Sequence, residues 1–314
     1  MILLLTRSDD VAADVLVLKL EELEFPFVRV NTDLVPDRYR LSWTLRDATI
    51  VTASRRRVAL GSVTSVWCRK AFGSDAPLPD DGYPERFVER ESLAALNGMI
   101  ETAPARYWMN RPAAIRRAEH KLLQLRVAVD VGFHVPPTLV SNDAEAVRAF
   151  VDGRDVIVKA VKSARTATSS GDRMVYTSGL DGSAMLSDAE IEACPTIYQA
   201  RVRKDHEMRV TVIGDTVFAT RIRTPPAHVD WRAAPSEDVA YKDCTVPPEF
   251  GARCRAMLRK LDLRYGAFDF AVTAADEPYF LEVNPGGQWA WLERATGVPM
   301  TDALARALHA ADLS

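Results

Sequence analysis

The sequence has little of several features that would assign it to a whole class of proteins. Its four cysteines among 314 residues are scattered, with no CxxC pair and no histidine at zinc-site spacing. We therefore expect neither a disulfide framework nor a zinc site, and we interpret the thiols as reduced, in a cytoplasmic protein. The formal net charge of −3 gives no electrostatic basis for binding nucleic acid or an anionic membrane surface.

Long hydrophobic runs and glycine-rich phosphate motifs are also missing. No apolar run reaches the length that spans a membrane. The opening MILLL is too short for an export signal and has no basic region before it, so we expect it to form the first strand of a sheet. Neither GxGxxG nor GxxxxGK[ST] occurs, which leaves Rossmann and P-loop nucleotide sites without support.

What is present predicts an α/β (α+β) protein in three segments, which we place at residues 1–112, 113–195 and 196–314. The first begins with a strand, a helix and a strand, which predicts a small parallel sheet. The second opens with one long amphipathic helix over 114–131, stopped by Gly132. It ends in a buried strand over 155–160, followed by a small, polar stretch over 162–172 that we expect to be a mobile loop.

The third segment predicts the most informative pattern, a hairpin of strands over 267–272 (AFDFAV) and 279–283 (YFLEV). Asp269 lies in the middle of the first strand, where a carboxylate needs a partner. Glu282 and Asn284 flank Val283, so the period of two places both side chains on one face. The three together form an all-oxygen ligand set suited to Mg²⁺. The alternative is a polar edge hairpin whose carboxylates face water.

Cationic residues precede this hairpin. Lys159 ends a buried strand beside the polar loop and Lys121 lies on the long helix; each suits either a phosphate contact or a solvated surface. Glu207 and Arg209 flank Met208 at the start of the strand predicted over 208–213, so their side chains share one face. Arg221 lies on the strand predicted to pair with it. Two arginines on adjacent strands repel unless an anion lies between them, which favours a phosphate site over a surface ladder.

The order of these pieces resembles the ATP-grasp superfamily, and more narrowly the ATP-grasp maturases of the microviridin and wider graspetide group. The matching text is VPPTLVSND, IYQARVRKDHEMRVTVIGD, HVDWR and LRYGAFDF…YFLEVNPGGQWAWLERATGVPMTDALA. The resemblance is tight from about residue 111 to the C-terminus and looser in the first segment, which includes SVWCRK. Cys68 of that motif stands where the family more often has an aromatic residue, and we interpret it as a buried small hydrophobe.

The resemblance implies an ATP-grasp fold with a small N-terminal parallel-sheet lobe, a central lobe and a C-terminal lobe, and with the nucleotide between the last two. By the same resemblance, the lysines contact ATP phosphates, the linker strand holds adenine, Glu207 lies near the ribose, and the two arginines neutralise the transferring phosphate or acyl phosphate. The residues so assigned are Lys121, Lys159, Gln199, Ala200, Val202, Glu207, Arg209 and Arg221, with Asp269, Glu282 and Asn284 as Mg²⁺ ligands and the loop 163–173 as a lid.

The activity implied is an ATP-dependent ligase that activates Asp or Glu side chains of a ribosomal precursor peptide, with leader and core, and joins them to Ser/Thr hydroxyls or Lys amines. Asp230 and Arg232 in HVDWR are candidates to bind the core carboxylate, and Trp289 either lines the peptide cleft or packs in the core. A ligase that adds a free amino acid and a non-catalytic peptide-binding module stay open as alternatives. The oligomeric state is open, with a homodimer as one option.

Overall fold

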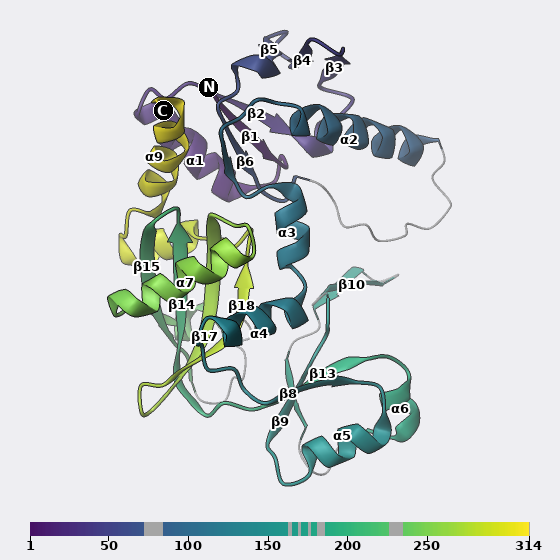
Figure 1. The fold of residues 1–314 in the computed structure, drawn as a ribbon, viewed down its shortest axis with the longest axis vertical. Helices are drawn as coiled ribbons and strands as arrows, with labels where there is room; N and C mark the ends of the chain where they lie inside the picture. Colours follow the sequence, from purple (N-terminus) through teal and green to yellow (C-terminus); the bar gives the residue numbers. More distant parts are fainter. Residues whose placement is uncertain are drawn as a thin grey trace.

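The computed structural model describes residues 1–71, 84–162, 165–168, 171–174, 177–180, 186–225 and 235–313. Three main sheets succeed one another along the long axis of the molecule (Figure 1). The N-terminal sheet lies at one end, the C-terminal sheet occupies the middle, and the central sheet, formed by the middle of the chain, lies at the other end. In the described part of the chain, no helix is long and apolar enough to cross a membrane.

The N-terminal sheet is parallel and has the strand order β2-β1-β6-β7. Every residue of β1 is buried, as expected for a central parallel strand covered on both faces. The predicted strand–helix–strand start is therefore confirmed. Its elements are β1 (Ile2–Thr6), α1 (Val11–Glu22), β2 (Phe27–Asn31), β6 (Ser65–Cys68), α2 (Glu85–Glu101) and β7 (Tyr107–Met109). A small antiparallel sheet is formed by β3 (Arg40–Trp43), β4 (Ala48–Val51) and β5 (Arg57–Ala59), with 3-10 turns η1 (Thr32–Leu34) and η2 (Leu60–Ser62).

The long helix predicted over 114–131 is in fact two helices, α3 (Pro112–Ala118) and α4 (Lys121–Asp130). The break is stabilised by Gln124, whose side-chain nitrogen donates to the carbonyl oxygen of Ala118 at 2.6 Å. That carbonyl would accept a backbone N–H in a continuous helix, so the side chain substitutes for the lost helical bond. The break starts a new helix at Lys121.

The central sheet is antiparallel, with the order β12-β9-β13-β8. Its strands are β8 (Thr138–Ser141), β9 (Val156–Lys159), β12 (Ser178–Leu180) and β13 (Thr196–Ala200), and its helices are α5 (Ala144–Val151) and α6 (Asp188–Glu192). Both helices pack on one face, around Val156 and Tyr198. The stretch predicted as a loop over 162–172 contains part of a hairpin, β10 (Arg165–Thr168) and β11 (Gly171–Met174).

The C-terminal sheet is antiparallel, with the order β16-β15-β14-β17-β18. Its strands are β14 (Lys204–Ile213), β15 (Thr216–Arg223), β16 (Ala240–Cys244), β17 (Tyr265–Thr273) and β18 (Pro278–Asn284). One face is apolar and packs on α3, α4 and α7 (Pro248–Lys260) around a cluster of phenylalanines. The predicted hairpin is confirmed as β17 and β18, and β16, preceded by the 3-10 turn η4 (Ser236–Asp238), forms the opposite edge of the sheet.

The C-terminal helices join the C-terminal sheet to the N-terminal one. α8 (Ala290–Thr296) and α9 (Met300–Leu313) share a core with α1 and with residues of β1 and β6. The Ser65 hydroxyl, at the start of β6, donates to the carbonyl oxygen of Leu308 on α9. The chain therefore ends beside its own beginning (Figure 1).

Candidate functional site

The polar residues of the predicted hairpin share one face of the C-terminal sheet. Asp269 of β17 pairs in register with Glu282 of β18 on one side and with Arg209 of β14 on the other. Asn284 lies two residues beyond Glu282, and residues two apart on a strand point to the same face. The predicted convergence of Asp269, Glu282 and Asn284 on one face is therefore confirmed by the strand register.

The pair Arg209–Asp269 is the centre of this face. One terminal nitrogen of the guanidinium, Nη1, donates to both carboxylate oxygens at 2.8 Å. Burial works against the charge of Arg209, but the Asp269 carboxylate outweighs it and raises the pKa of the guanidinium. The Nε–H of Arg209 is buried and has no hydrogen-bond partner in the described part of the chain. A buried donor of this kind is ready to bind an anion.

The donor set suits a magnesium ion. Asp269 retains a side-chain exposure of 13 %, and Asn284 is exposed. The Asn284 side-chain oxygen accepts from the backbone N–H of Gly286 at 2.9 Å, which orients the amide and leaves its second lone pair. Two carboxylates and one amide oxygen on a single face are hard oxygen donors of the kind Mg²⁺ prefers.

Gln124 is a positioning residue that sequence reasoning missed. It is 4 % exposed on α4, and its side chain donates to the carbonyl of Val283 and accepts from the N–H of Val283, both at 2.9 Å. These bonds satisfy the outer edge of β18 between Glu282 and Asn284. They also fix α4, and with it Lys121, against the candidate ligands. No local pattern distinguishes such a glutamine from a surface residue.

The two predicted lysines meet at the end of β9. The Lys121 ammonium donates to the carbonyl oxygen of Ala160 at 3.1 Å, and the Lys159 ammonium donates to Oε1 of Gln199 at 2.7 Å. The Gln199 nitrogen in turn donates to the Thr138 hydroxyl at 2.9 Å. Lys159 and Gln199 lie on the face of the central sheet opposite α5 and α6, because the register pairs them with Ile197 and Ile157, which are not part of the helix-covered cluster around Val156 and Tyr198.

The linker assigned to adenine joins the two sheets. Ala200 ends β13 and its N–H donates to the carbonyl of Pro137 at 2.9 Å, so this donor is already used within the central lobe. Val202 lies in the short connection 201–203 that leads into β14. Glu207, at the start of the polar face, is 7 % exposed and forms an ion pair with Lys204. These residues border the space between the central and C-terminal sheets.

Arg221 does not join Arg209. The register pairs Arg221 with Met208 on β14 and with Lys242 on β16, whereas Arg209 pairs with Thr220. Directly paired residues of an antiparallel ladder point to the same face, so the side chain of Arg221 leaves the sheet on the side of the apolar core. The prediction that both arginines flank one anion is wrong for Arg221.

Trp289 is a core residue and does not line a cleft. Its side chain is fully buried, its indole N–H donates to the Thr301 hydroxyl at 2.9 Å, and its ring contacts those of Trp67 and Tyr265 edge-on. The core alternative is therefore the correct one.

Asp230 and Arg232 lie outside the described residues, as do parts of the predicted lid, and their assignments stay predictions.

Two residues of the N-terminal segment complete the frame. The Asn110 side chain accepts from the backbone of Arg264 and Tyr265 and donates to the carbonyls of Tyr265 and Pro285, which ties β7 to both ends of the hairpin. Cys68 is buried, as predicted, and burial raises the pKa of its thiol to about 12. At neutral pH the thiol is therefore protonated and inert.

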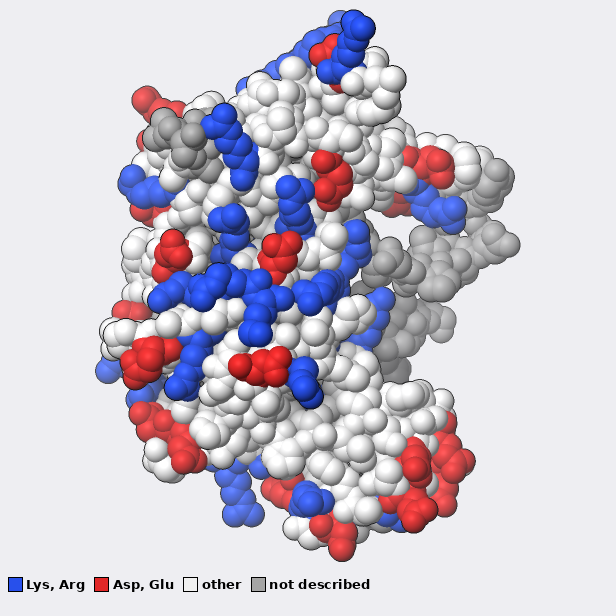
Figure 2. Space-filling model, viewed as in Figure 1, with Lys and Arg blue, Asp and Glu red and all other residues white. Residues whose placement is uncertain are grey.

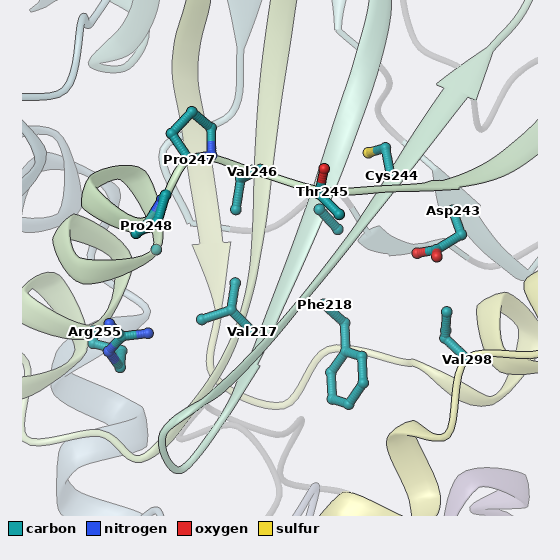
Figure 3. Close-up of a pocket in the computed structure, with 12 residues that line it drawn as sticks. Val217, Phe218, Asp243, Cys244, Thr245, Val246, Pro247, Pro248, Arg255 and Val298 are labelled. Atoms are coloured by element: carbon teal, nitrogen blue, oxygen red, sulfur yellow. The ribbon is translucent and has the colours of Figure 1, made fainter.

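Charge and shape distinguish other parts of the surface. Lys and Arg side chains form a band across the middle of the face shown in Figure 2, over α7, and acidic side chains gather over α5 and α6. A cavity of about 490 Å³ lies between β15, β16 and the start of α7 (Figure 3). None of the predicted site residues lines it.

Comparison with known proteins finds similar sequences and similar structures. Residues 1–116 match the family described as the MvdD pre-ATP grasp domain. The macrocyclase MdnB from Microcystis aeruginosa MRC is 29 % identical with a TM-score of 0.75, and 98 % of each chain is covered. A RiPP-associated ATP-grasp ligase from Chryseobacterium gregarium, solved with ADP and a leader and core peptide, is 26 % identical with a TM-score of 0.86, over 100 % of this chain and 97 % of that one.

This is the ATP-grasp fold. A third match, the ATP-grasp ligase PsnB solved with minimal precursor, Mg and ADP, is 24 % identical with a TM-score of 0.78, over 99 % of this chain and 96 % of that one. No curated protein matches the chain in sequence. The resemblance to the ATP-grasp peptide maturases is confirmed, and it extends over the whole chain, including the N-terminal segment where the sequence match is loosest.

Proposed function

We propose that the protein is an ATP-dependent ligase that activates a side-chain carboxylate of a ribosomal precursor peptide and joins it to a hydroxyl or amine of the same peptide. The observation that carries this proposal is the shared face of Asp269, Glu282 and Asn284, with Arg209 fixed in its centre. Matches of near-complete coverage to a macrocyclase and to a ligase solved with leader and core peptides support the peptide substrate.

Each group has a role in this chemistry. Lys121 and Lys159 would bind nucleotide phosphates, because Lys159 ends β9 and the Lys121 ammonium, from α4, reaches the carbonyl of the next residue, Ala160. Backbone groups of the connection that contains Val202 would face adenine, with Glu207 near the ribose. Asp269, Glu282 and Asn284 would hold Mg²⁺, which when bound supplies positive charge to the phosphate oxygens.

A carboxylate is a poor electrophile, and phosphorylation by ATP makes it reactive. The carboxylate oxygen attacks the γ-phosphorus and ADP leaves. The hydroxyl or amine then attacks the acyl carbon of the acyl phosphate, forms the ester or amide bond, releases its proton and displaces inorganic phosphate. Arg209 would offer its unpartnered Nε–H to the oxyanion formed in these steps. Water has to be excluded meanwhile, and residues 163–173, assigned as a lid, would serve that purpose.

Intact-mass spectrometry of a co-expressed precursor peptide rich in Thr, Ser, Asp and Glu tests the proposal. A crosslink removes the mass of one water per bond and requires ATP and Mg²⁺. A gain in mass would instead support the ligase that adds a free amino acid. An unchanged peptide, with no peptide-stimulated release of ADP, would support a binding module. A cytoplasmic location and a homodimer remain predictions that accompany this proposal.

A further inference from the structure

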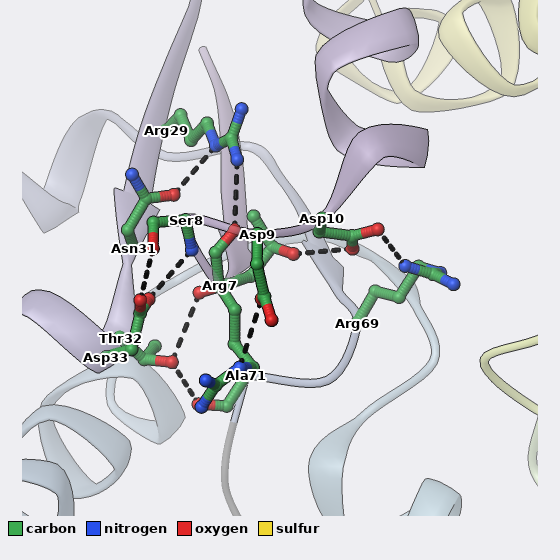
Figure 4. Close-up of polar contacts among 11 residues, drawn as sticks. Arg7, Ser8, Asp9, Asp10, Arg29, Asn31, Thr32, Asp33, Arg69 and Ala71 are labelled. Carbon is green, nitrogen blue, oxygen red and sulfur yellow. Dashed lines mark hydrogen bonds and ion pairs between the residues drawn. The ribbon is translucent and has the colours of Figure 1, made fainter.

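Arg69 is a buried arginine that the proposed mechanism does not use. It follows β6 at the carboxyl edge of the N-terminal sheet and is 1 % exposed. Its terminal nitrogen Nη1 donates to Asp10, which is itself fully enclosed (Figure 4). Its Nε and Nη2 are buried and have no hydrogen-bond partner among the described residues.

The two nitrogens without partners are the ones that could bind an oxyanion. Nε and Nη2 lie along one edge of the planar guanidinium and form the fork that binds two oxygens of a carboxylate or phosphate side by side. Each buried N–H group without a partner is costly, and native proteins rarely tolerate such groups without a reason. Arg69 thus presents a complete oxyanion fork while its remaining end is neutralised by Asp10.

The position of Arg69 connects this fork to the candidate ligase site. Its guanidinium carbon lies 5.8 Å from the centre of the Trp289 ring, in the segment that follows Asn284. A Cβ placed on Gly286 would lie 3.9 Å from both the Arg69 Cγ and the Asn284 side-chain oxygen, so Arg69 and the candidate ligand Asn284 flank the same glycine. Arg69 and Arg209 both act electrostatically on Tyr265, whose hydroxyl donates to the carbonyl of Gly287 at 2.7 Å.

We propose that the Nε and Nη2 edge of Arg69 binds the side-chain carboxylate that the ligase activates, as a subsite formed by the N-terminal sheet and the loop after Asn284. The inference rests on the proposed function. A carboxylate fits better than a nucleotide phosphate because the phosphate-directed lysines come from the central sheet and α4, whereas Arg69 follows β6 of the N-terminal sheet. Asp10 and Asp269 neutralise the two guanidiniums in the resting state.

The test uses ¹⁵N-labelled full-length protein and N-acetyl-glutamate N-methylamide as the probe, titrated with and without Mg-ADP. We expect the probe to shift the Nε–H resonance of Arg69, assigned by its loss in Arg69→Lys, and the indole N–H resonance of Trp289. N-acetyl-glutamine N-methylamide, which has the same shape without the charge, should shift neither. Equal shifts with both probes, or no shift with the glutamate probe, would overturn the subsite.

Two variants and one further ligand complete the experiment. Arg69→Lys keeps a charge for Asp10 but loses the fork, so the affinity for the probe, followed at the Trp289 indole, should fall at least about tenfold, with Mg-ADP affinity within about twofold. Arg29→Lys, which alters a part-exposed arginine on the same sheet, should change neither affinity. Inorganic phosphate that shifts Arg69 when the carboxylate probe does not would contradict the carboxylate assignment. Failure of Mg-ADP to bind at all would count against the proposed function, whereas the probe titration judges the subsite by itself.

Discussion

Among the residues that the structure describes, two arginine–aspartate pairs are buried, one at the edge of the N-terminal sheet and one in the middle of the C-terminal sheet, and they differ in what surrounds the carboxylate. Asp10 is fully enclosed, accepts from the Thr6 hydroxyl at 2.7 Å and pairs with Arg69. Asp269 has both oxygens on Arg209 but keeps a side-chain exposure of 13 %. The first carboxylate is closed off from solvent, and the second is partly exposed to it.

The difference determines which group of each pair, the carboxylate or the guanidinium, can contact a ligand. Asp269 stands in register with Glu282, so a divalent cation can be shared between them without removing Arg209. Asp10 pairs in register with no second carboxylate among the described residues, and Nε and Nη2 of its arginine have no partner there. In the C-terminal pair both a partly exposed carboxylate and the Nε–H of Arg209 can meet a ligand, whereas in the N-terminal pair only the guanidinium can.

The largest effect is expected from Glu282→Gln, which removes a metal ligand without changing the shape of the side chain. Turnover should fall by about a hundredfold or more, because metal-bound charge contributes several kcal/mol to such reactions. Melting temperature should hardly change. Glu277→Gln, at the exposed turn of the same hairpin, is the control. Full turnover with unchanged Mg²⁺ dependence in Glu282→Gln would remove Glu282 from the site.

Asp10→Asn should affect stability instead. It leaves the buried Arg69 without its counter-charge, and breaking a buried pair in this way costs roughly 3–5 kcal/mol. The matched control, Asp14→Asn, breaks the half-exposed pair with Arg29 and should cost less than about 1 kcal/mol. Urea unfolding measures both. Equal losses of unfolding free energy in the two variants would show that enclosing the Asp10–Arg69 pair does not increase its contribution to stability.

Gly287→Ala probes the space beside Arg209. An added Cβ would lie 2.5 Å from the Cβ of Ala267 and 2.9 Å from Nη2 of Arg209, so the strand or the guanidinium has to move. Overpacking of this kind costs about 1–3 kcal/mol, and we expect turnover to fall with it. Gly286→Ala meets nothing closer than 3.9 Å and should be nearly neutral in unfolding free energy. The prediction fails if Gly286→Ala is the more damaging of the two.

The smallest effect is expected from Arg221→Lys. Its side chain is on the opposite face from Arg209, so turnover should change by less than about twofold, in line with the small effects of substitutions away from functional features. Arg209→Lys, by contrast, loses the planar fork and should reduce turnover strongly. Steady-state kinetics of the two variants compares the faces directly. A loss in Arg221→Lys as large as that in Arg209→Lys would place both arginines at one site.

Much of the C-terminal half could be predicted because its signals are local. The period of two fixes the shared face of Glu282 and Asn284, and the hairpin turn brings Asp269 opposite them. The same arithmetic could have placed Arg221 correctly. A two-residue turn at 214–215 pairs Ile213 with Thr216, and counting outward pairs Arg221 with Met208.

The remaining features depend on contacts between residues far apart in the sequence. Gln124 satisfies an edge strand 159 positions further along, and Arg69 meets a loop more than two hundred positions away. Neither contact leaves a periodic or compositional trace. The break before Lys121 is similar, because it depends on a glutamine side chain taking over one helical carbonyl. Contacts between residues distant in the sequence determine these three features, and local secondary-structure propensity does not.

The most direct test of the central claim is a calorimetric titration of ADP into wild-type protein and Glu282→Gln, each with and without Mg²⁺. If Asp269, Glu282 and Asn284 hold the metal that binds the nucleotide, Mg²⁺ should tighten ADP binding to the wild type by at least about tenfold, a typical coupling between two ligands. That gain should disappear in Glu282→Gln. An equal gain in both proteins would contradict the account.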